Sequence, residues 1–82
     1  MINLKEKNVL VTGGSGFLGR KLVERLQSYG CNSIIVVARD EGKLIHLTQD
    51  YKNIKIVTGD ISDKFVIQQC FTYRVDCIFH LA

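Results

Sequence analysis

The chain has 82 residues, of which 46% are hydrophobic and 23% charged, and this is the composition of a packed globular protein rather than a disordered one. Its length allows one small domain at most, and its net charge of +3 comes from basic residues scattered along the chain, so nucleic acid is not an expected partner. The first eight residues are too polar for a signal peptide, and no apolar run approaches the ~20 residues of a membrane span. We therefore expect a cytoplasmic protein with no membrane contact.

The three cysteines, Cys31, Cys70 and Cys77, are odd in number and show no metal-ligand spacing. Each lies at or beside an apolar segment. We expect buried free thiols in a reducing compartment, and we predict neither a disulfide nor a metal site.

The first half of the chain predicts a strand, a helix and a second strand. Residues 8–12 form a short β-branched run that ends in glycines, which favours a buried strand. An amphipathic helix should follow from Phe17 and end at Gly30. Residues 33–38 contain four consecutive β-branched residues without alternation, which is typical of a strand covered on both faces in a parallel sheet. The predicted apolar face of the helix consists of Leu18, Leu22, Val23, Leu26 and Tyr29.

The second half continues the alternation. A helix is predicted over residues 40–50, with Asp40 at its start, and a third strand over residues 54–58. Ser62 or Asp63 should cap a third helix, and residues 76–81 should form a fourth strand. The predicted packed face of the third helix is Phe65, Val66, Gln69, Cys70 and Tyr73.

This β-α-β-α-β-α-β order predicts the α/β class, with a parallel sheet joined by right-handed crossovers. Residues 1–82 would then be the first half of a Rossmann-type, doubly wound domain. Ligands of such sheets bind beyond the carboxyl ends of the strands. The apolar fourth strand would be an open sheet edge, so we also expect self-association and marginal stability of the isolated chain.

The glycine-rich turn after the first strand predicts a pyrophosphate site. Gly14, Gly16 and Gly19 fit the G-x-G-x-x-G template, and Gly13, Gly16 and Gly19 fit the G-x-x-G-x-x-G variant equally well. The predicted strand and helix on either side supply the context that the template requires, which disfavours the alternative of a ligand-free turn. Glycines let the backbone approach the phosphates, and the start of the helix attracts their charge. The predicted contact residues are Gly13, Gly14, Ser15, Gly16, Phe17, Leu18 and Gly19.

The segment from Thr12 to Gly19 resembles the T-G-x-x-G-x-x-G signature of the extended short-chain dehydrogenase/reductase family. Residues 59–63, Gly-Asp-Ile-Ser-Asp, resemble the adenine-contacting motif of that family. Residues 80–82, His-Leu-Ala, are similar to its H-x-A-A segment beside the ribose and phosphate. The resemblance implies a dinucleotide cofactor and adds these contact residues: Asp60, Ile61, His80, Leu81 and Ala82. From the residues alone, Asp60 could instead cap the third helix, and His80 could be a core histidine.

Within the family, residues 37–44 and the Gly-Asp-Ile-x-Asp segment most resemble the nucleotide-sugar 4,6-dehydratases of polysaccharide biosynthesis. This implies the cofactor half of a nucleotide-sugar dehydratase or epimerase, with a nucleotide-sugar as substrate of the full-length parent. Gly-Phe-Leu-Gly also occurs in the acyl reductase and steroid dehydrogenase branches. Two alternatives therefore stay open, namely a reductase of those branches and a module that senses the dinucleotide without catalysis.

The chemistry of the family needs a tyrosine and a lysine in Y-x-x-x-K spacing on one helix. Tyr51 and Lys55 have this spacing, but Lys55 falls in the predicted third strand. We therefore predict no catalytic residue, and whether the chain is an enzyme by itself stays open.

The end of the second strand favours NADP over NAD as the cofactor. An NAD site places a carboxylate there to bind the ribose hydroxyls, but this chain has Ala38 followed by Arg39. The small Ala38 leaves room for a 2'-phosphate, which the Arg39 guanidinium can bind. In the alternative, Asp40 is the ribose carboxylate, Arg39 is a surface charge, and the cofactor is NAD.

Overall fold

The computed structural model describes residues 3–13, 17–39, 42 and 45–81. In this part of the chain, four strands and three helices alternate, as the sequence predicts. The elements are β1 (Asn8–Thr12), α1 (Phe17–Gln27), β2 (Ser33–Ala38), α2 (Ile45–Asp50), β3 (Ile54–Thr58), α3 (Lys64–Phe71) and β4 (Cys77–His80).

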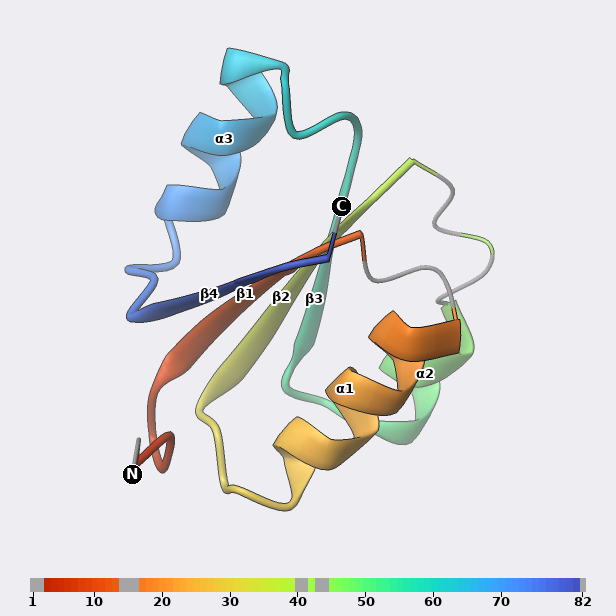
Figure 1. Cartoon of the computed structure of the whole chain (residues 1–82), viewed down its shortest axis with the longest axis vertical. Coiled ribbons are helices and arrows are strands. Elements are labelled where there is room, and N and C mark those ends of the chain that lie inside the picture. The colour runs from red at the N-terminus through yellow and green to blue at the C-terminus, as the bar shows by residue number, and fades with distance from the viewer. Residues whose placement is uncertain (1–2, 14–16, 40–41, 43–44, 82) are drawn as a thin grey trace.

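The four strands form one parallel sheet in the order β3-β2-β1-β4 (Figure 1). The chain steps outward from β1 to β2 and β3, and then returns to place β4 on the free side of β1. Because crossovers between parallel strands are right-handed, this reversal moves the connecting helix to the other face of the sheet. Figure 1 shows α1 and α2 on one face and α3 on the other. The predicted doubly wound architecture is confirmed.

Two hydrophobic cores lie on the two faces of the sheet, because alternate residues of each strand point in opposite directions. β2 is buried at every position, as its unbroken apolar run predicts. The core beneath α1 and α2 includes Val9, Val11, Ile34, Val36, Val23, Leu26 and Leu47. The core beneath α3 consists of Leu10, Ile35, Val37, Val57, Val66 and Cys70.

The predicted apolar face of α1 is partly wrong. The buried stripe runs through Gly19, Val23 and Leu26, which are four and three residues apart. Leu18 precedes Gly19 by one residue, which rotates it by ~100° away from the sheet, and it is 69% exposed. Tyr29 lies beyond the last residue of the helix and is also exposed. A buried glycine carries no hydrophobic signal, and the apolar residues of the helix therefore predict a displaced stripe.

A similar rotation corrects the predicted face of α3. Val66 and Cys70, one helical turn apart, are buried against the sheet. Phe65 and Gln69 each precede one of these residues and are exposed. Tyr73 lies beyond the end of the helix, where it packs at the margin of the core.

The ends of two other elements also differ from the prediction. α2 begins at Ile45, and Asp40, its predicted first residue, lies outside the described residues. β4 is one residue shorter than predicted at each end. It forms an edge of the sheet, and its Ile78 is 51% exposed. The self-association expected from such an edge stays a prediction.

The three cysteine thiols are free. Cys31 and Cys70 are buried, and burial raises the pKa of both thiols, whereas Cys77 is only half-buried. Among the described residues, no helix is long and apolar enough to cross a membrane.

Candidate functional site

A pocket of about 370 Å³ lies beyond the carboxyl ends of the four strands. This is the edge at which parallel α/β sheets bind their ligands. The pocket brings together residues that are far apart in the sequence. It is lined by Thr12, Gly13, Val37, Arg39, Gly59, Asp60, Ile61 and His80.

Five of these eight lining residues are predicted contact residues: Gly13, Arg39, Asp60, Ile61 and His80. The other three, Thr12, Val37 and Gly59, are not among the predicted contact residues. Each stands within two residues of a predicted contact at the end of a strand, and this position is the signal that could have found them.

Four of the other predicted contact residues are described by the structure, and none of these four lines the pocket. Phe17 begins α1, Leu18 is exposed in its first turn, and Gly19 is buried. Leu81 follows β4 and is half-buried. The rest, Gly14, Ser15, Gly16, Asp40 and Ala82, lie outside the described residues.

Gly13 joins the tips of β1 and β4 at the pocket. Its φ of +73° is in the left-handed region that favours glycine, and a Cβ at this position would lie 2.1 Å from the carbonyl oxygen of Leu81. The Leu81 N–H donates a hydrogen bond of 3.0 Å to the Thr12 carbonyl. The close approach of the two strand ends therefore depends on the absence of a side chain at Gly13.

The same strand ends are joined by a side-chain contact. Thr12 and His80 are register partners, and Thr12 Oγ1 lies 2.5 Å from His80 Nδ1. Thr12 is buried, whereas His80 is exposed at the pocket, so the predicted alternative of a core histidine is wrong. The contact engages the Nδ1 atom of the His80 ring.

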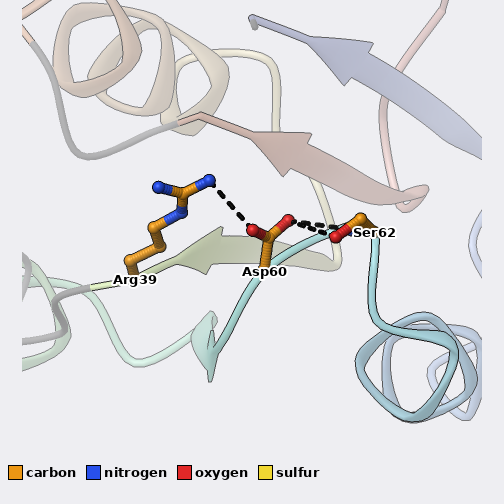
Figure 2. Close-up of polar contacts among 3 residues, drawn as sticks. All are labelled: Arg39, Asp60 and Ser62. Carbon is orange, nitrogen blue, oxygen red and sulfur yellow. Dashed lines mark hydrogen bonds and ion pairs between the residues drawn. The ribbon is translucent and has the colours of Figure 1, made fainter.

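An ion pair lies at the ends of β2 and β3 (Figure 2). Arg39 Nη2 donates to Asp60 Oδ2 over 2.9 Å, and the Ser62 N–H and hydroxyl both donate to Asp60 Oδ1, each over 2.9 Å. The Gly59 N–H donates to the Ala38 carbonyl over 2.9 Å and so fastens the two strand ends together.

These contacts favour the ionised form of Asp60. The Ser62 N–H and hydroxyl, followed by the Arg39 guanidinium, hold the pKa of the Asp60 carboxyl below its usual value. The alternative in which Asp60 caps α3 is wrong, because Asp63 is the N-cap and accepts from the Phe65 N–H over 2.9 Å. The Asp60 carboxylate therefore stays at the pocket as a fixed anion.

Tyr51 and Lys55 lie as predicted. Tyr51 follows the last residue of α2, and Lys55 is in β3. They share no helix, so their Y-x-x-x-K spacing does not form the catalytic pair of the resembled family.

The sequence model of the NAD-dependent epimerase/dehydratase family matches residues 9–82. The chain belongs to this family. The match extends from the second residue of β1 to the last residue of the chain, and it therefore includes every element of the sheet. The resemblance inferred from the glycine turn and the two later motifs is confirmed.

Three relatives illustrate the range of the family. An epimerase from Methanothermobacter thermautotrophicus has 37% identity and a TM-score of 0.80, over 96% of this chain and 23% of that chain. The Bordetella bronchiseptica enzyme WbmF, solved with NAD+ and UDP, has 30% identity and a TM-score of 0.79 over the same shares. UDP-glucuronic acid decarboxylase 4 of Arabidopsis thaliana is 34% identical over 99% of this chain and 18% of its own length. The chain thus spans a quarter or less of these relatives.

Proposed function

We propose that this chain binds a nicotinamide dinucleotide in the pocket beyond the carboxyl ends of its strands, as the cofactor portion of a nucleotide-sugar dehydratase or epimerase. The observation that carries the proposal is the convergence of three separate motifs on one pocket. Gly13 comes from the glycine turn, Arg39 from the end of β2, and Asp60 from the Gly-Asp-Ile segment after β3. Family membership and the structure of WbmF with NAD+ and UDP support both the cofactor and the substrate class.

The residues present fit such a cofactor. A volume of about 370 Å³ is within the usual range of ligand pockets. α1 is the helix that follows the glycine turn, and it has no acidic residue in its first turn, so no carboxylate there opposes the binding of an anion at the positive end of the helix. When bound, a nicotinamide dinucleotide supplies reversible hydride transfer. The residues of this chain would bind it and orient its adenosine end.

The preferred cofactor in this proposal is NADP. Ala38, where an NAD site would have a carboxylate, is the last residue of β2 and is only 5% exposed, and the residue that follows it, Arg39, lines the pocket. The ion pair with Asp60 occupies Nη2, and a guanidinium has further N–H groups that can bind a phosphate. Asp40, on which the NAD alternative depends, lies outside the described residues.

Arg39→Ala should weaken NADP binding about ten- to hundredfold and leave NAD binding nearly unchanged, because only NADP carries the 2'-phosphate. Isothermal titration of the chain with each dinucleotide measures both affinities. Arg25→Ala is the matched control, since it removes the same charge from the last turn of α1. Equal affinity of the unmodified chain for NAD and NADP, or a parallel loss of both in Arg39→Ala, would refute the NADP assignment.

A further inference from the structure

We infer that Asp60 is a positioning residue that holds the Arg39 guanidinium at the pocket and thereby increases the preference of the site for a 2'-phosphorylated dinucleotide. This inference rests on the proposed function and deepens it. It starts from the ion pair in Figure 2, in which the two side chains come from the ends of neighbouring strands.

Asp60 is anchored independently of Arg39. Both hydrogen bonds from Ser62 end on Oδ1, whereas Arg39 contacts Oδ2. The backbone is fixed as well, since the Asp63 N–H donates to the Asp60 carbonyl over 2.9 Å and the preceding Gly59 is bonded to Ala38. The carboxylate is therefore a fixed point whose second oxygen, Oδ2, binds Arg39 at the end of β2.

Arg39 is the partner that needs positioning. Its side chain is 82% exposed, whereas that of Asp60 is 44% exposed. A long exposed side chain loses rotamer freedom when it binds a ligand, and that loss lowers the affinity. The bond to Asp60 restricts the guanidinium before the ligand arrives, and it uses one nitrogen of a group with five N–H donors. Restraint and phosphate binding are thus compatible.

The opposing effect is repulsion between the Asp60 carboxylate and a 2'-phosphate. The Arg39 guanidinium would bind both anions, and its positive charge offsets their mutual repulsion. The Asp60 carboxylate also repels the pyrophosphate of the cofactor. NAD and NADP share this group, so the effect cancels in the ratio of their affinities. We therefore expect the positioning effect to exceed the repulsion.

The test is a double-mutant cycle on the complete 82-residue chain, with the NADP-to-NAD affinity ratio as its readout. Asp60→Asn keeps an oxygen for Ser62 but removes the ion pair, and it should lower the ratio about three- to tenfold. In the Arg39→Ala background, the same substitution should leave the ratio unchanged. Asp76→Asn is the matched control, because that carboxylate bonds Asn8 at the opposite end of the sheet. Circular dichroism establishes that each variant is folded.

The outcomes separate this inference from the proposed function. A ratio that rises in Asp60→Asn would mean that Asp60 competes with the phosphate for Arg39, and an equal fall in both backgrounds would mean that Asp60 acts without Arg39. Either result overturns the positioning role while the cofactor assignment stands. If Arg39→Ala itself leaves the ratio unchanged, the NADP assignment fails first, and the positioning role fails with it. If Asp60→Asn shifts both affinities together and leaves the ratio unchanged, Asp60 contacts the adenosine that both cofactors share, and the positioning role is likewise overturned.

Discussion

Gly13→Ala is expected to lower the free energy of unfolding by about 2–4 kcal/mol. Alanine at the observed φ of +73° is strained, and its Cβ would lie 2.1 Å from the backbone oxygen of Leu81. The end of β4 would have to move, and the hydrogen bond from Leu81 to Thr12 would be distorted. A domain of this size has a total stability of roughly 4–12 kcal/mol, so the loss is a large fraction of it.

Gly30→Ala is the control for this substitution. Gly30 has the same φ of +73°, but the nearest atom to its added Cβ is a side-chain carbon of Lys5 at an ordinary 3.7 Å. The free energy of unfolding of this variant should fall by only ~1 kcal/mol, which is the cost of holding alanine at a positive φ. Urea unfolding followed by circular dichroism compares the two. Equal losses would show that the contact between Gly13 and the end of β4 does not constrain the fold.

Gly16→Val should abolish dinucleotide binding, with a loss of at least about a hundredfold for NAD and NADP alike. In the glycine template the second conserved glycine lets the backbone approach the pyrophosphate, and a branched side chain would occupy that volume. Gly16 lies outside the described residues, so this prediction rests on the motif and on the positions of Gly13 and Gly19 at its two ends.

Gly16→Ala provides a graded control for this prediction, because its single methyl group should weaken binding less than valine does. The readout is calorimetric titration of variants that melt like the unmodified chain. A folded Gly16→Val chain that binds with unchanged affinity would remove the glycine turn from the proposed site.

The sequence predicted the strands better than the helix faces, and the reason is physical. A parallel strand covered on both faces needs apolar residues at every position, so the run in β2 is unambiguous. A short helix touches the sheet along only one narrow stripe. In α3 that stripe is Val66 and Cys70, and the large apolar side chain of Phe65 beside them is exposed. Apolar character alone therefore could not fix the rotation of the helix.

The candidate site was predicted in part for a similar reason. Motifs at the ends of strands locate Gly13, Arg39 and Asp60, because the carboxyl ends of parallel strands meet at one edge. The ion pair between Arg39 and Asp60 could not be predicted. It depends on the register of β2 and β3 and on the turn at Gly59, whose φ is +147°. These are properties of the folded backbone rather than of a residue pattern.

The most direct test of the proposed site is to map where NADP binds by following the backbone amides of the ¹⁵N-labelled chain in solution. We expect the amide signals of Gly13, Arg39, Asp60 and His80 to shift as NADP is added. A second pocket of about 440 Å³, lined in part by Asn32, Asn53 and Tyr73, lies at the amino ends of the strands and should stay unaffected. Shifts confined to that opposite end, or no saturable shift at the carboxyl ends, would contradict the assignment.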